Sequence, residues 1–93
     1  MMLLPTQIIL KTSDSIFMIY FELNIQITPN SETASDILSA LLAEAGFEAF
    51  EPTEDGLLAW IQQTLYDSVA LEEVVSSFPL SEVSISYSLN EAP

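Results

Sequence analysis

Most of the ionisable side chains of this chain are carboxylates. Adjacent acidic pairs occur at Glu54-Asp55 and Glu72-Glu73, and Glu51 with the first pair could bind calcium weakly. The ligand spacing of an EF-hand is absent, and neighbouring side chains on a helix point about 100 degrees apart. We therefore interpret both pairs as solvated charge, not as an acid–base pair or a metal site.

Most residue types that active sites rely on are missing. The chain has no His, no Cys and a single basic residue, Lys11. Neither a His-based triad nor a zinc site can form without those residues. Gly46 and Gly56 are the only glycines, so no glycine-rich phosphate loop is present. The sequence predicts no catalytic, cofactor-binding or metal-binding residue and favours a recognition domain.

The charge of the chain is strongly one-sided. The formal net charge is −13, and when Asp14 is subtracted from the fourteen acids, thirteen acids and no base remain between Met18 and Pro93. Such a surface repels nucleic acid and anionic lipid and attracts basic partners. We therefore expect neither nucleic acid nor a membrane as partner. The absence of Cys suits a reducing compartment, and we expect a cytoplasmic protein.

The length of 93 residues suits a single domain, and 49% hydrophobic residues are enough for a core. The apolar start differs from a secretory signal, because Lys11 follows the apolar stretch and Pro5 interrupts it. It is also shorter than the roughly 20 residues of a membrane span. We expect residues 1–17 to be an extension outside the core fold and residues 18–93 to form one domain.

Hydrophobic periodicity predicts the elements of this domain. Alternating apolar and polar residues predict four strands, over 16–27, 47–52, 57–63 and 83–89. Helical spacing predicts one helix between Ser31 and Gly46 and another between Asp67 and Pro79. Asp55-Gly56 is typical of a hairpin turn, and this turn favours a strand for the residues after it, which could also be helical.

The order strand, helix, strand, strand, helix, strand is the split βαβ arrangement. Right-handed crossovers place both helices on one face of a four-stranded antiparallel sheet. We therefore predict an α+β, ferredoxin-like fold, βαββαβ, in which the other sheet face is open.

Pleating assigns side chains to that open face. The outward set is polar, acidic and partly aromatic: Tyr20, Glu22, Asn24, Gln26, Glu48, Phe50, Leu58, Trp60, Gln62, Ser84, Ser86 and Ser88. Ala49 is expected to point inward. Exposed aromatic side chains among polar ones are typical of protein contact surfaces. From this face and the hairpin we predict a partner-binding set: Tyr20, Glu22, Glu48, Phe50, Glu54, Asp55 and Trp60. Alternatively, Phe50, Leu58 and Trp60 pack against residues 1–15 or another domain.

Several short motifs in order resemble a known family. They are Tyr20-Phe21-Glu22, the run LLAEAGFE over 41–48, Glu54-Asp55-Gly56-Leu57 and Phe78-Pro79. Over residues 18–92 the chain resembles the amino-terminal domain of the PrmA family, the methyltransferases of ribosomal protein L-eleven. Residues 1–17 depart from the family.

The resemblance implies a function. In that family this domain recognises the ribosomal protein, and a separate Rossmann-like domain binds S-adenosylmethionine and methylates amino groups. The cofactor loop and catalytic residues of that domain are absent here, so none is carried over, and this chain alone is not expected to be an enzyme. The implied partners are a basic ribosomal protein and the chain's own catalytic domain, with S-adenosylmethionine as cofactor of that missing domain.

The residues leave alternatives open. A free-standing acidic interaction protein, such as an inhibitor or a nucleic-acid mimic, would carry the same charge. An ACT-type small-molecule sensor shares the element order, but its ligand loop joins the first strand to the first helix, whereas Asp55-Gly56 lies in a hairpin. The edge strands carry no Lys, which leaves homodimerisation through a sheet edge open.

Overall fold

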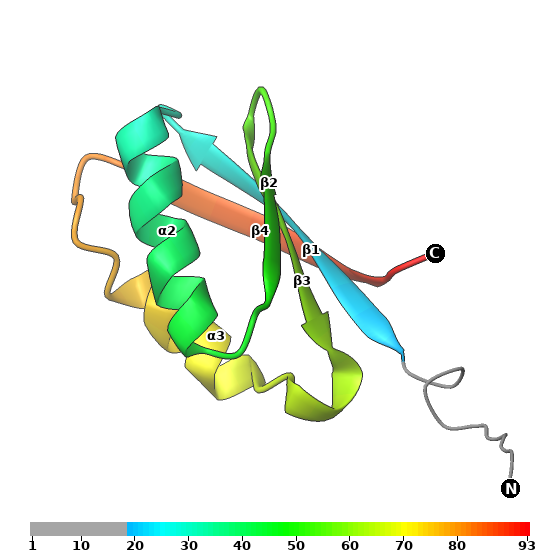
Figure 1. The fold of residues 1–93 in the computed structure, drawn as a ribbon. Helices are drawn as coiled ribbons and strands as arrows, with labels where there is room; N and C mark the ends of the chain where they lie inside the picture. Colours follow the sequence, from blue (N-terminus) through cyan, green and yellow to red (C-terminus); the bar gives the residue numbers. More distant parts are fainter. Residues whose placement is uncertain (1–18) are drawn as a thin grey trace, which may run out of the picture.

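A computed structural model describes residues 19–93 of the chain (Figure 1). The predicted extension, residues 1–17, lies outside the described residues, as does the start of the predicted first strand. The elements are β1 (Tyr20–Thr28), α2 (Glu32–Glu44), β2 (Ala49–Pro52), β3 (Gly56–Gln62), the 3-10 helix η2 (Gln63–Leu65), α3 (Ser68–Ser76) and β4 (Ser84–Glu91). The segment that could also have been helical is thus a strand followed by one short helical turn.

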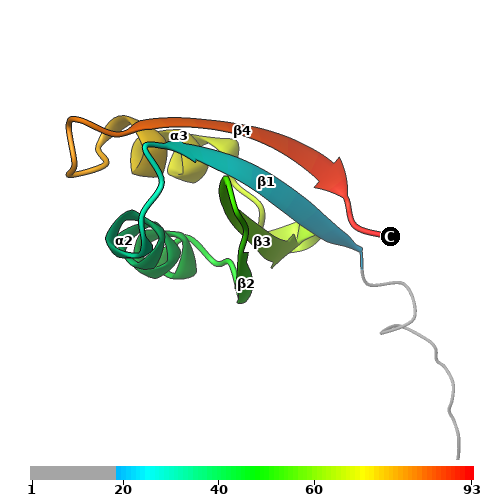
Figure 2. The ribbon, with the colours of Figure 1, turned by 90° about the horizontal axis from the view of Figure 1, so that it is seen from above.

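The four strands form one antiparallel sheet in the order β2-β3-β1-β4. β1 lies in the middle and pairs with β3 on one side and β4 on the other. Both helices lie on the same side of this twisted sheet (Figure 2). The predicted ferredoxin-like α+β fold is confirmed. Within residues 19–93, none of the helices has the length and apolar character to cross a membrane.

The core lies between the sheet and the two helices. Alternate residues of β1 and β3 are buried, and Leu38, Leu42 and Leu71 meet them from the helices. The buried strand residues are Leu23, Ile25, Ile27, Leu57, Ala59 and Ile61. This two-residue period follows from the pleat and was predicted from the sequence.

The helix ends follow the predicted capping residues. The side chains of Ser31 and Asp67 accept N–H groups from the first turns of α2 and α3. Gly46 has φ +105°, and the N–H of Phe47 donates to the carbonyl of Leu42 at 3.0 Å. This bond closes α2 as a Schellman motif. Gly46, in the left-handed conformation, then returns the chain to the sheet at the buried Phe47.

β2 departs from the predicted alternation. The N–H of Glu48 donates to the carbonyl of Trp60 at 2.9 Å, and Ala49 is also opposite Trp60 in the ladder. Two residues facing one make a β-bulge, which shifts the alternation by one residue. Ala49 therefore lies exposed on the open face, and Phe50 pairs with Ala59 and packs against the core. The predicted orientations of Ala49 and Phe50 were wrong for this reason.

Candidate functional site

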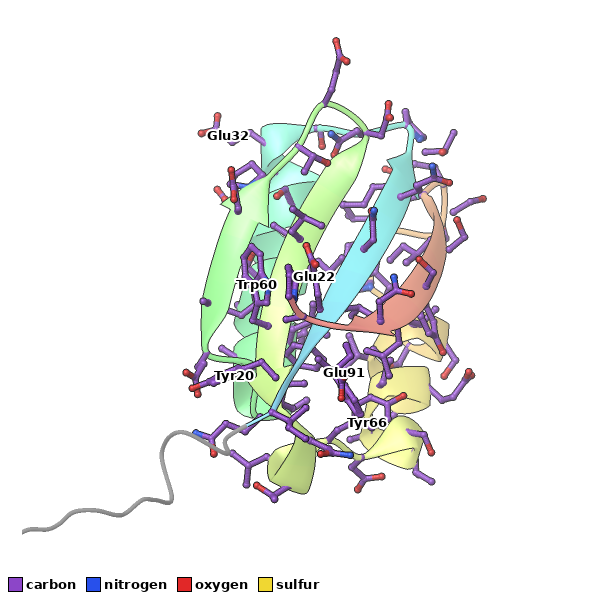
Figure 3. The ribbon with its side chains drawn as sticks, turned by 90° about the vertical axis from the view of Figure 1, so that its right-hand side faces the viewer. Tyr20, Glu22, Glu32, Trp60, Tyr66 and Glu91 are labelled. Atoms are coloured by element: carbon purple, nitrogen blue, oxygen red, sulfur yellow. The ribbon has the colours of Figure 1, made fainter. Side chains whose placement is uncertain are left out.

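The open sheet face is the candidate site. It is the side of the sheet away from α2 and α3, and Figure 3 looks onto it, with Tyr20, Glu22 and Trp60 labelled. β1 and β3 supply these three side chains, and the pairing sets Glu22 opposite Trp60 and Tyr20 opposite Gln62. Residues directly opposite in an antiparallel pair share a face. The register thus gathers predicted contact residues on one end of this face.

A hydrogen-bonded group at that end joins β1, β3 and Glu48, the residue before β2. The Tyr20 hydroxyl donates to Glu48 Oε2 at 2.7 Å, and Gln62 Nε2 donates to Glu48 Oε1 at 3.3 Å. The hydrogen bond to the Glu48 carboxylate raises the pKa of the Tyr20 phenol, because it favours the neutral form. The bulge aims Glu48 at this group. Sequence reasoning placed Gln62 on the face but missed its role, which depends on the strand register.

Trp60 and Glu22 lie next to this group, on the two central strands of the sheet. Both side chains are half-buried, and Trp60 has Glu22 on one side and the small Ala49 on the other. An aromatic ring beside a carboxylate suits a Lys or Arg side chain, whose stem packs on the ring while its charge meets the acid.

The two acids of the β2–β3 hairpin, Glu54 and Asp55, lie apart from Tyr20, Glu48 and Gln62. Thr53 and Gly56 exchange backbone hydrogen bonds of 2.9 and 3.3 Å, so exposed Glu54 and Asp55 form a two-residue loop. Gly56 therefore opens β3 and is not at the centre of the turn. The Asn30 amide donates to the carbonyl of Glu54 at 3.1 Å and holds the loop against the start of α2. Glu54 and Asp55 thus lie at the opposite end of β3 from Gln62.

The acidic side chains of the described residues are dispersed over the surface. Within residues 19–93, no group of three acidic side chains gathers to hold a metal ion. Both glycines have a structural role in the backbone: Gly46 ends α2, and Gly56 lies against the carbonyl of Ile25. Neither lies in a glycine-rich loop at the start of a helix. The aromatic and acidic side chains of the open face suit contact with a protein.

Comparison with known proteins gives the family. Over 73 residues, 78% of the chain, it is 47% identical to the ribosomal protein L11 methyltransferase of Phocaeicola vulgatus. It is 45% identical over the same length to the protein of that name from Bacteroides fragilis, and 44% to that from Bacteroides thetaiotaomicron. The match is 26% of each relative, so the chain spans about a quarter of their length. No family model and no solved structure matches. On this likeness the chain belongs to the ribosomal protein L11 methyltransferase family.

Proposed function

We propose that this chain is the amino-terminal domain with which a ribosomal protein L11 methyltransferase recognises its protein substrate. The observation that carries the proposal is the 47% identity over 73 residues to a protein of that name. Methyl transfer from S-adenosylmethionine would belong to a further domain, because the residues described here hold no cofactor loop. The proposed setting is the cytoplasm, where ribosomal proteins are made.

Charge supports a ribosomal protein as partner. Residues 19–93 hold thirteen acids, the fourteen of the chain less Asp14, and no base. A protein that binds ribosomal RNA is expected to be basic, since it neutralises phosphates. Attraction between the two surfaces would raise the rate of encounter and disfavour acidic competitors.

The proposed contact centre is the group around Trp60. The partly exposed indole, with Glu22 opposite it, offers an aromatic anchor next to a charge, and such anchors dominate many interfaces. Tyr20 and Glu48 extend this centre toward one end of the sheet. Glu54 and Asp55 would form a second contact at the hairpin. Phe50 is left out, because it faces the helices.

Calorimetric titration of the chain with ribosomal protein L11 tests the proposal. We expect binding that weakens as salt rises from about 0.05 to 0.5 M, because the Debye length falls from over 10 Å to about 4 Å. Trp60→Ala should weaken binding at least about tenfold. Val69→Ala is the matched control, since Val69 is 67% exposed on α3, away from this face. Unchanged affinity in Trp60→Ala, with the fold intact, would refute the assigned centre.

A free-standing acidic interaction module is the second candidate, and the charge favours it equally. Such a module would bind many unrelated basic proteins about as well as ribosomal protein L11. An ACT-type sensor has no support from the topology, because Glu54 and Asp55 join β2 to β3 and not β1 to α2. Parallel titrations with lysozyme and with ribosomal protein L11 separate the first two candidates.

A further inference from the structure

β4 is an open edge of the sheet. It spans eight residues and pairs with β1 without interruption, from Phe21 opposite Glu91 to Thr28 opposite Ser84. No other strand of the described chain pairs with its outer side, and Figure 3 shows it as the outermost strand on the right of that view. It contains no Pro, Lys or bulge, the devices that usually stop an edge from pairing.

The opposite edge is protected. β2 has only four residues, ends in Pro52 and begins at the bulge of Glu48 and Ala49 opposite Trp60. Short length, proline and a bulge each prevent a further strand from pairing. The difference between the two edges leaves β4 as the one suited to accept a strand.

The pairing defines which backbone groups β4 offers. The N–H of Ala92 donates to the carbonyl of Tyr20 at 2.8 Å, which fixes the hydrogen-bonding phase of the β1–β4 ladder. In an antiparallel ladder the residues that bond to the neighbour alternate with residues whose groups point away. Ile85, Tyr87 and Leu89 therefore point their N–H and C=O groups outward. No backbone bond to them outside the sheet occurs within residues 19–93.

We propose that an extended segment of the basic substrate adds to β4 as a fifth strand. This rests on the proposed function for the identity of the substrate. Charge selects the occupant: a second copy would bring another net −13 toward the first, whereas a basic segment meets attraction. Acids lie along the edge, with Glu91 at its end and Glu72 held beside it by a 2.8 Å hydrogen bond from the Tyr87 hydroxyl. Backbone bonds would give affinity and register.

A proline scan of the edge tests this. The Leu89→Pro variant loses an N–H group that points outward from the sheet. The sheet itself should tolerate this change, because proline fits on an edge strand where its nitrogen faces solvent. Leu89→Ala is the matched control, because it loses the same side-chain packing and keeps the N–H. We expect Leu89→Pro to bind ribosomal protein L11 at least about tenfold more weakly than Leu89→Ala. Equal affinity of the two folded variants would overturn the proposal.

Amide hydrogen exchange gives a second readout that does not depend on a variant. In the chain alone, the amides of Ile85, Tyr87 and Leu89 should exchange fast, and those of Ser86 and Ser88 slowly. Ribosomal protein L11 should slow the first three. Protection of those three in the chain alone would overturn the proposal, because residues 1–18 or a second copy then occupy the edge; sedimentation tells which.

Failure of the proposed function has a different signature. If ribosomal protein L11 does not bind the unaltered chain, the proposed function fails and the edge loses its named occupant. If it binds, and Trp60→Ala weakens the complex while the three edge amides stay unprotected, recognition through the open face stands and the edge proposal is refuted.

Discussion

Replacement of Gly56 by Ala should separate β1 from β3. A Cβ atom at Gly56 would lie 2.0 Å from the carbonyl oxygen of Ile25 and 2.9 Å from its carbonyl carbon. Carbon and oxygen atoms of neighbouring strands normally approach to about 3.3 Å. Both atoms met are backbone, so no side chain can rotate away, and the strands must part locally by about 1.3 Å.

The cost of Gly56→Ala can be estimated from what this shift disturbs. Overpacking costs roughly 1–3 kcal/mol. The same shift loosens the bond from the N–H of Ile27 to the carbonyl of Asp55, 2.9 Å long, which is worth about 1 kcal/mol. We expect a loss of about 2–4 kcal/mol, a large share of the roughly 4–11 kcal/mol that a domain of this size has in total. Urea unfolding followed by far-UV circular dichroism measures it.

Gly46→Ala is the control for Gly56→Ala. Its φ of +105° strains any L-residue, but the nearest atom to the added Cβ is the Cδ1 end of the Ile61 side chain at 3.4 Å, an ordinary contact distance. Backbone strain alone costs about 1–2 kcal/mol. Gly56→Ala should therefore be the more damaging of the two. A Gly56→Ala chain within 0.5 kcal/mol (about the usual error) of the unaltered chain would refute the close approach of β1 and β3.

Three further predictions concern packing, capping and pH. Leu42→Ala should cost about 2–5 kcal/mol, because Leu42 is fully buried, and more than Leu41→Ala, because Leu41 is half-buried; urea unfolding compares them. Asp67→Ala should cost about 1 kcal/mol, since its side chain caps α3; thermal unfolding with Asp67→Asn as the conservative variant checks this. The hydrogen bond to Glu72 raises the pKa of the Tyr87 phenol above 10.0, so its stabilisation is complete below pH 10 and is lost as pH rises through the folded pKa. Tyr87→Phe should therefore lose less stability than the unaltered chain between pH 9 and 11.5, and identical pH profiles would contradict this.

Local signals predicted most of the fold. The caps Ser31 and Asp67 and the helix stop Gly46 act through backbone groups within a few residues, so the sequence shows them directly. Alternation in β1, β3 and β4 is equally local, because each strand has one buried face. The order of these elements then left few topologies to choose from.

The incorrect predictions concern residues whose position depends on how one strand pairs with another. The bulge at Glu48 has no sequence signature, so the predicted alternation of β2 continued unbroken and turned Phe50 outward. The pair Asp55-Gly56 is typical of a turn, whereas Gly56 begins β3, where its small size is needed for the approach of β1. The bonds of Tyr20 and Gln62 to Glu48 depend on a register that becomes visible only in the assembled sheet.

The open face and the β4 edge would act on different steps of binding. Charges such as Glu22 and Glu48 reach across water, so they raise the rate of encounter and lose that effect in salt. The outward groups of Leu89 and its neighbours act only at contact, and salt screens them little. High salt should therefore slow association, whereas Leu89→Pro should speed dissociation. The open face and the β4 edge would therefore complement each other, because the charges attract a basic protein and the backbone groups of β4 fix its register.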